Sequence, residues 1–251
     1  KIIKRSYMEG KYLELLITIT IPVLLVLSAI LYGSTDYNFY LKEIENGAID
    51  KDVVSEAKAK QIASETLLFL KGKGELTESL VGTNAKAHMN DVKDIRDITK
   101  YVIYIAAVLF VISVVTLFLI HKPFRIAKSL IHSAIIILIF NSLLFAASKF
   151  FFNMLWTKFH EIIFTNNLWQ LDPSTDALVA VFSEQFFIDF ITRIVVITSL
   201  ISVILLIKGI YFHHFVWKES NDIAPKRELP ADLEEVADET KSEGSKEDFQ
   251  W

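Results

Sequence analysis

The histidines of this chain are its best candidates for proton transfer near neutral pH, and there are six of them. Four lie at or just inside the edges of long apolar runs, on one predicted side of a membrane: His121, His132, His213 and His214. His88 and His160 instead stand just beyond the ends of two such runs, on the other predicted side. Neutral imidazoles at one membrane surface suit general acid–base catalysis, whereas two ordinary interfacial histidines are the alternative interpretation.

An acidic residue accompanies the first of these histidines. Asp91 follows His88 by three positions, and residues three apart share one face of a helix. A carboxylate there could hold the His88 ring in one tautomer and favour its protonated form.

Several other kinds of chemistry are excluded or disfavoured. The chain has no cysteine, which excludes disulfides, thiolate metal sites and a cysteine nucleophile. It has no Gly-x-Ser-x-Gly elbow and no histidine spacing typical of zinc enzymes, so we expect neither a serine hydrolase nor a metal site. A net charge of −4 and the lack of a phosphate-binding glycine loop argue against nucleic-acid partners. We expect no cofactor.

The composition and the apolar runs indicate a membrane protein. Hydrophobic residues make up 52% of the chain and charged residues only 22%. Formal charge is absent from residues 15–35, 101–120, 130–148 and 194–207. A helix of about 20 apolar residues crosses the hydrocarbon core, and Arg193 and Lys208 at the ends of the shortest run could extend to the headgroups. The sequence therefore predicts an all-α, polytopic bundle with spans at about 13–34, 99–120, 129–152 and 189–212.

Basic residues predict the orientation of these spans. They are concentrated in residues 1–11 and 121–128 and after the fourth span, whereas 153–188 contain Lys158 as their only basic residue. We expect a membrane domain over 1–218 with both termini in the cytoplasm, and a disordered acidic tail over 219–251. Residues 36–98 and 153–188 are then extracytoplasmic.

The two outer segments have helical patterns of their own. Apolar residues recur at helical spacing over 44–70, which predicts one or two amphipathic helices. No helix breaker interrupts 88–98, so this stretch should extend the second span, and 156–164 should continue the third. Six aromatic residues lie between positions 159 and 187, and we interpret them as a belt at the membrane interface: Phe159, Phe164, Trp169, Phe182, Phe186 and Phe187.

Two motifs carry a resemblance to a known family. The first is His88-Met89-Asn90-Asp91-Val92, ahead of the second span. The second follows the third span and reads Phe159-His160-Glu161…Phe164…Trp169…Asp172-Pro173…Asp176…Phe182-x-Glu184-x-Phe186-Phe187. With the four-span layout, they resemble the lipoprotein intramolecular transacylase family of Gram-positive bacteria over most of residues 10–215. Ser183 departs from the pattern, where a proline is expected.

This resemblance implies an acyltransferase of the bacterial cell membrane, with its active site at the extracytoplasmic face. It would move the sn-2 acyl chain of a diacylglyceryl lipoprotein to the α-amino group of the lipoprotein's N-terminal cysteine, giving an N-acyl lyso-lipoprotein. It implies catalytic roles for His88 and His160, with general base and acid interchangeable, and supporting or substrate-binding roles for five residues: Asp91, Glu161, Trp169, Asp176 and Arg193. The partners would be the lipoprotein and membrane lipids.

Other interpretations stay open. Glu161 and Asp176 could be ordinary solvated carboxylates, and Arg193 could extend to headgroups or pair with Asp189. The whole chain could be a non-enzymatic lipid-binding or accessory membrane protein. A transporter is disfavoured because the spans hold almost no charge, and metal-dependent hydrolysis would require sensitivity to chelators.

Overall fold

The computed structural model describes residues 2–223, and the side chains of residues 10–215. The described residues form helices joined by loops, without a strand, and the helices follow one another as α1 (Ile2–Gly33), α2 (Tyr37–Glu45), α3 (Glu56–Leu70), α4 (Glu78–Val81), α5 (Thr83–Leu119), α6 (Pro123–Phe150), α7 (Phe152–Ile163), α8 (Ala177–Val181) and α9 (Glu184–Ile223). The predicted tail lies outside the described residues, apart from 219–223 at the end of α9.

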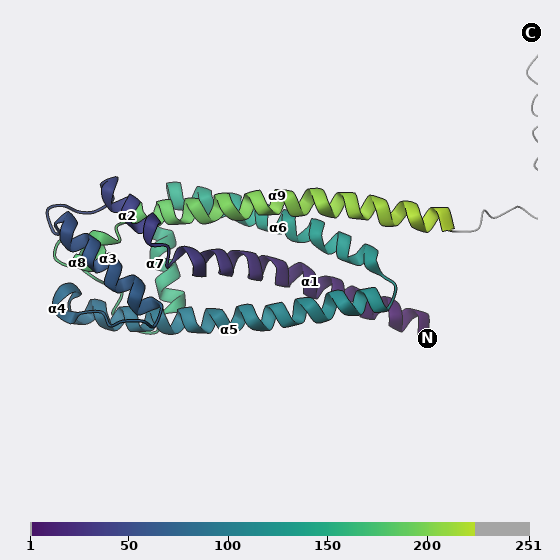
Figure 1. The fold of residues 1–251 in the computed structure, drawn as a ribbon, viewed down its shortest axis with the longest axis horizontal. Helices are drawn as coiled ribbons and strands as arrows, with labels where there is room; N and C mark the ends of the chain where they lie inside the picture. Colours follow the sequence, from purple (N-terminus) through teal and green to yellow (C-terminus); the bar gives the residue numbers. More distant parts are fainter. Residues whose placement is uncertain (1, 224–251) are drawn as a thin grey trace, which may run out of the picture. The chain divides into compact units, whose positions relative to one another are not determined.

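Four helices are long and apolar enough to cross a membrane: α1, α5, α6 and α9. They confirm the predicted all-α, polytopic architecture, and they run alongside one another in Figure 1. Helix α5 has 37 residues and is therefore about 55 Å long, well beyond the roughly 30 Å hydrocarbon core. Its uncharged part begins at residue 101, so residues 83–100 extend past the membrane-spanning part. This is the predicted extension of the second span.

Hydrogen bonds between polar side chains join the spans. The Arg125 guanidinium in α6 binds the Glu14 carboxylate in α1 at 2.6 Å. Near the middle of α6, the Asn141 amide donates to Thr198 Oγ1 and Ser199 Oγ in α9, at 2.9 and 2.8 Å. Because lipid offers no competing partners, such bonds fix which helix faces are in contact. A small apolar core of α1, α5 and α6 lies close by, formed by Ile17, Ile21, Leu117, Ile126 and Ile137.

A second, larger core lies at the end of the bundle where α1 ends and α9 begins. We call it the helical lobe; it comprises α2, α3, α4 and α8 with the first turns of α5 and α9. The apolar pattern of residues 44–70 is confirmed, because the end of α2 and the whole of α3 bury it here. The interface-belt interpretation differs from the structure for Phe182 and Phe186, whose rings pack against Tyr40 inside this core. These aromatic rings stabilise the lobe instead of anchoring it in lipid.

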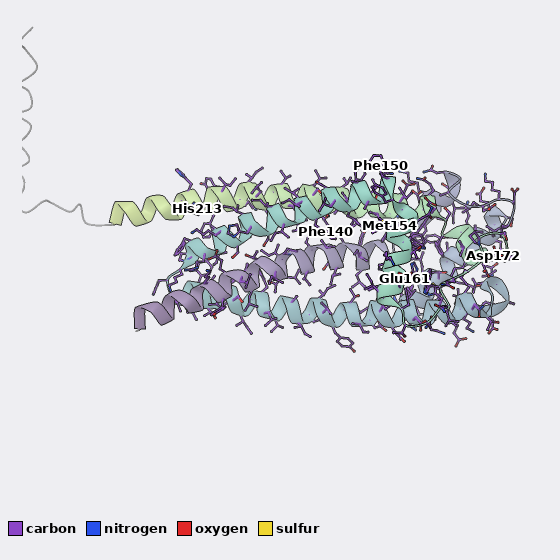
Figure 2. The ribbon with its side chains drawn as sticks, turned by 180° about the vertical axis from the view of Figure 1, so that it is seen from behind. Phe140, Phe150, Met154, Glu161, Asp172 and His213 are labelled. Carbon is purple, nitrogen blue, oxygen red and sulfur yellow. The ribbon has the colours of Figure 1, made fainter. Side chains whose placement is uncertain are left out.

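Helix α7 corrects one expectation. Residues 156–164 do not continue α6, because the helix breaks at Phe151 and α7 runs across the ends of the spans (Figures 1 and 2). Neither Gly nor Pro marks the break. The two faces of α7 explain it physically: Met154 and Ile162 are exposed on one face, whereas Phe152 and His160 are buried on the other. An exposed apolar face on a helix at the ends of the spans is typical of a helix lying in the membrane interface.

Candidate active site

Helices α5 and α7 bring His88 and His160 together. Their ring centroids are 5.9 Å apart and the rings are tilted by 39°. Both side chains are buried, with exposed fractions of 8% for His88 and 4% for His160. The chain therefore places its two predicted histidines side by side, at the junction between the spans and the helical lobe.

The backbone fixes the tautomer of His160. Its Nδ1 lies 2.8 Å from the carbonyl oxygen of Trp156, one turn earlier in α7. A carbonyl oxygen can only accept a hydrogen bond, so Nδ1 carries the hydrogen and donates it. The other nitrogen, Nε2, therefore keeps its lone pair and can accept a proton.

Aromatic rings form a wall around the histidine pair. His160 contacts Trp156 at 4.4 Å and Trp169 at 4.9 Å between ring centroids. Phe164 touches both histidines, at 4.9 Å from His88 and 5.4 Å from His160. Trp169, a predicted supporting residue, is thus placed against the pair. Such a wall lowers the local polarity and limits the access of water.

This environment favours neutral imidazoles. Burial, and to a lesser extent the neighbouring His160, lower the pKa of His88 to about 4, although Asp91 partly opposes the shift. Burial also lowers the pKa of His160, against the opposing effect of its bond to the Trp156 carbonyl. Both groups lie outside the membrane-spanning segments, since His88 precedes residue 101 by more than three helical turns and α7 is not a span. At pH 7 the pair is therefore uncharged.

Asp91 has a different partner from the one predicted. Its Oδ2 accepts a hydrogen bond from the Asn166 side-chain amide at 2.9 Å, and Asn166 Oδ1 accepts the backbone N–H of Leu168 at 3.0 Å. The buried Nδ1 of His88 has no hydrogen-bond partner among the described residues. Asp91 thus ties the loop after α7 to α5. Sequence reasoning did not single out Asn166, whose only signal was its place in the break after α7.

Glu161 and Asp176 are not brought to the histidine pair. Glu161 is exposed and binds Lys158 at 2.6 Å. Asp176 precedes α8, where its Oδ2 accepts the backbone N–H of Asp172 at 2.6 Å. Among the described residues, no group of three or more His, Asp or Glu side chains is placed to hold a metal ion.

Arg193 binds the turn between α1 and α2. Its guanidinium forms an ion pair with Asp36 and lies over the Phe39 ring, 5.0 Å from the ring centroid. Burial alone would raise the pKa of Asp36, but the hydrogen bond and the charge of Arg193 lower it instead. The ion pair with Asp36, and not one with Asp189, therefore fixes the start of α9 against the end of α1.

The fold and the site define a class: a multi-pass helical membrane protein with a buried, neutral histidine pair at one end of its spans. The family model described as lipoprotein intramolecular transacylase Lit matches residues 15–187. The chain belongs to this family of acyltransferases, which confirms the resemblance drawn from the two motifs.

Solved structures support the same fold. An in meso structure of the membrane-integral lipoprotein intramolecular transacylase Lit from Bacillus cereus matches with a TM-score of 0.72 and 22% identity, over 84% of this chain and 97% of the other. A structure of the same protein with one histidine replaced by arginine matches with a TM-score of 0.70 and 21% identity, over 88% of this chain and 97% of the other. A structure with alanine in place of the same histidine matches with a TM-score of 0.71 and 21% identity, over 88% of this chain and 99% of the other. A comparison with curated protein sequences found no significant match.

Proposed function

We propose that this acyltransferase moves the sn-2 acyl chain of a diacylglyceryl lipoprotein to the α-amino group of the lipoprotein's N-terminal cysteine. The observation that carries the proposal is the pair of buried, neutral imidazoles 5.9 Å apart. Family membership supports a lipoprotein as the substrate. The chain itself lacks cysteine, so the cysteine belongs to the substrate.

His160 acts as the general base. Its Nε2 lone pair takes a proton from the amine as the amine nitrogen attacks the ester carbonyl, because Nδ1 is already committed to Trp156. His88 acts as the general acid and donates a proton to the leaving glyceryl oxygen as the carbon–oxygen bond breaks. An amide bond forms and an ester bond is lost. A proton passing from His160 to His88 then restores both imidazoles.

The remaining demands on the protein are modest. Donor and acceptor belong to one molecule, and well-oriented intramolecular groups reach effective molarities of about 10⁵ M or more. The competing reaction is hydrolysis of the ester by water. The wall of Trp156, Phe164 and Trp169 opposes it by keeping the pair dry.

We further propose that the helical lobe and the histidine pair face the outside of the cell, with the membrane domain carrying both ends of the chain in the cytoplasm. The support is the excess of basic residues in 1–11 and 121–128 and their scarcity in 153–188. The diacylglyceryl group of a lipoprotein lies in the outer leaflet, so in this orientation the pair and the ester are on the same side of the membrane.

The test uses the purified full chain and a synthetic diacylglyceryl lipopeptide, with the product followed by mass spectrometry. The product has the same mass as the substrate, and fragmentation shows the acyl chain on the amine. We expect His88→Ala and His160→Ala each to lower turnover by about 10²–10⁴-fold. The matched control is His132→Ala, which removes an exposed histidine of α6 and should leave turnover unchanged. Normal turnover in both site variants would contradict the proposal, and lipopeptide binding without conversion by the wild type would favour the lipid-binding alternative.

The two roles are separable with an activated ester, whose leaving oxygen needs no protonation. Such a substrate should restore most of the turnover of His88→Ala, because the acid is no longer required. The activated ester should not restore the turnover of His160→Ala, because the amine must still lose its proton. The opposite pattern would exchange the two roles.

A further inference from the structure

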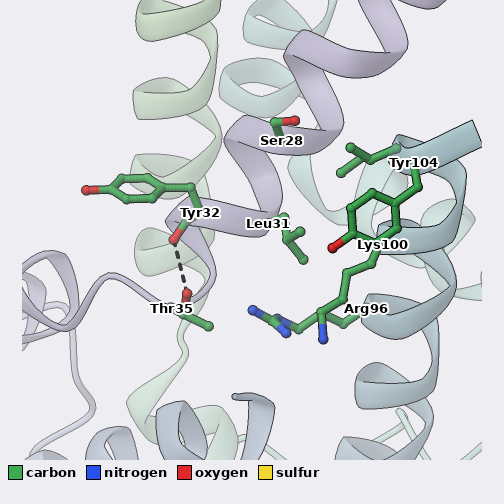
Figure 3. A pocket seen from close by; sticks show the side chains of 8 residues that line it. Ser28, Leu31, Tyr32, Thr35, Arg96, Lys100 and Tyr104 are labelled. Carbon is green, nitrogen blue, oxygen red and sulfur yellow. Dashed lines mark hydrogen bonds between the residues drawn. The ribbon is translucent and has the colours of Figure 1, made fainter. Parts of the chain in front are cut away.

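A pocket of about 320 Å³ lies between α1 and α5, apart from the histidine pair. Residues on successive turns of both helices line it: Ser28, Leu31 and Tyr32 from α1, Thr35 from the turn after α1, and Arg96, Lys100, Ile103 and Tyr104 from α5. Figure 3 shows Arg96 and Lys100 reaching from α5 into the space beside α1, with the Tyr104 hydroxyl turned toward the same space. The pocket thus combines two cations and several hydroxyl groups with the apolar side chains of Leu31 and Ile103.

The Arg96 guanidinium has unused hydrogen-bonding capacity. Its Nε is buried and has no hydrogen-bond partner, and no acidic side chain within the described part of the chain forms an ion pair with it. A buried donor without a partner is costly, and one explanation for it is a partner that the protein itself does not supply, such as a bound ion or ligand. Arginine is the side chain best matched to phosphate oxygens. The guanidinium therefore points to an oxyanion as the missing partner.

The charges around the pocket match a monoanion. Lys100 shares its charge with Asp97, to which its Nζ binds at 2.6 Å. Arg96, Lys100 and Asp97 together carry a net charge of +1. A phosphodiester carries one negative charge and would make this group neutral, whereas a zwitterionic headgroup would bring a cation of its own and leave the net charge at +1.

The depth of the pocket matches the position of lipid phosphates. Arg96 and Lys100 come directly before the uncharged run that begins at residue 101, so they lie at the edge of the hydrocarbon core. Beyond them along α5, the side chains of Tyr104, Ile105 and Val108 are exposed and form an apolar surface. The pocket is too small for a whole phospholipid, but its volume suits a headgroup, and acyl chains could then lie on this surface.

We propose that the pocket between α1 and α5 binds the phosphodiester of an anionic phospholipid through Arg96 and Lys100. A diacylglyceryl lipopeptide has no phosphate, so this ligand is distinct from the acyl-transfer substrate. The site lies about 12 Å along α5 from His88 and contains neither histidine. It therefore stands or falls independently of the proposed acyl transfer.

Native mass spectrometry of the purified full chain tests this site. The protein in detergent is titrated with phosphatidylglycerol, with zwitterionic phosphatidylcholine, and with sn-glycerol 1-phosphate and inorganic phosphate. The wild type should retain one phosphatidylglycerol in preference to phosphatidylcholine. The double variant Arg96→Gln/Lys100→Gln should bind phosphatidylglycerol at least about tenfold more weakly. Lys149→Gln is the matched control, because Lys149 is a lysine at the same end of the bundle that does not line the pocket.

A second variant guards against misfolding of the charge-neutralised protein. Leu31→Trp fills the pocket and leaves both cations in place, and it should also abolish retention of phosphatidylglycerol. Equal binding of phosphatidylcholine, an equal loss in Lys149→Gln, or undiminished retention in either pocket variant would overturn the proposal. Binding of inorganic phosphate or sn-glycerol 1-phosphate as tightly as the lipid would show a site for free phosphate and would also overturn it.

Discussion

At the scale of single residues, the site is defined by what each imidazole nitrogen can do. The Trp156 carbonyl leaves His160 with a free lone pair at Nε2, whereas His88 has a buried Nδ1 without a partner among the described residues. Burial keeps both rings neutral, so neither must lose a solvent-derived proton before it works at pH 7. An ordinary surface histidine would be partly protonated there.

The low pKa of His88 predicts a pH-dependent stability. The unfolded chain binds a proton on His88 below about pH 6.5, whereas the folded protein binds it only near pH 4, so the free energy of unfolding falls with falling pH between these values. Between pH 7 and 4.5 the wild type should lose about 2 kcal/mol that His88→Asn does not lose. Unfolding midpoints of both proteins in detergent measure the difference. Equal losses in the two proteins would contradict the burial argument.

The Asp91–Asn166 hydrogen bond predicts an effect on turnover from outside the histidine pair. Asn166→Ala should free the loop that carries Trp169 and open the aromatic wall, lowering acyl transfer by about tenfold with some hydrolysed ester as a by-product. Asn167→Ala is the matched control, because Asn167 is next to Asn166 in the same loop and its side chain is exposed. Mass spectrometry of the lipopeptide products distinguishes transfer from hydrolysis. Identical product ratios in both variants would show that the loop does not protect the site.

At the scale of helices, polar contacts between the spans fix the relative positions of α1, α6 and α9. Asn141 joins α6 to α9 through Thr198 and Ser199, and Arg193 with Asp36 joins α9 to the end of α1. Both contacts connect residues that are distant in the sequence. The helices that they join are also neighbours of the two histidine-bearing helices, because α5 packs against α1 and α7 packs against α6.

Replacing Asn141 by leucine tests this linkage. The loss of two interhelical hydrogen bonds in the membrane should destabilise the protein by about 1 kcal/mol. Ser142→Ala is the control, because Ser142 is exposed and donates only to Leu138 within its own helix. Thermal unfolding in detergent compares the variants with the wild type. A larger loss in Ser142→Ala than in Asn141→Leu would contradict the role given to Asn141.

Arg193 offers a second test at this scale. Arg193→Met should lower the unfolding midpoint, because Asp36 is left without its cation, while turnover per folded molecule stays within about twofold. This separates a positioning role from contact with the substrate. A loss of turnover comparable to that of the histidine variants would instead place Arg193 in the acyl-transfer step.

Local patterns predicted the elements better than the contacts between them. The uncharged runs and the breaker-free stretch before residue 101 predicted the spans and the extension that carries His88. The break at Phe151 was missed because no Gly or Pro marks it; burial of Phe152 and His160 produces it. The pairing of Arg193 with Asp36 joins residues 157 positions apart, a separation at which neither helical spacing nor local charge pattern identifies a partner.

At the scale of the whole membrane domain, the four spans set the height of the histidine pair. Helix α7 lies across their ends with apolar side chains exposed on one face and His160 on the other. Turnover should therefore depend on bilayer thickness, since a thicker or thinner membrane shifts the ester relative to the pair. In phosphatidylcholine vesicles we expect a maximum near acyl chains of about 16–18 carbons and a several-fold decline on either side. A flat profile would contradict this.

The position of α7 also bears on which lipoproteins the protein can accept. In the proposed acyl transfer, a histidine pair held at one level of the interface would act on an ester at that level, and the N-terminal amine of the lipoprotein is the only other group that must reach the pair. The rest of the lipoprotein chain, after its N-terminal cysteine, would extend into the water outside the membrane. Mature lipoproteins with unrelated folds should thus be modified alike, as long as a few extended residues separate the lipid-bearing cysteine from the first folded element.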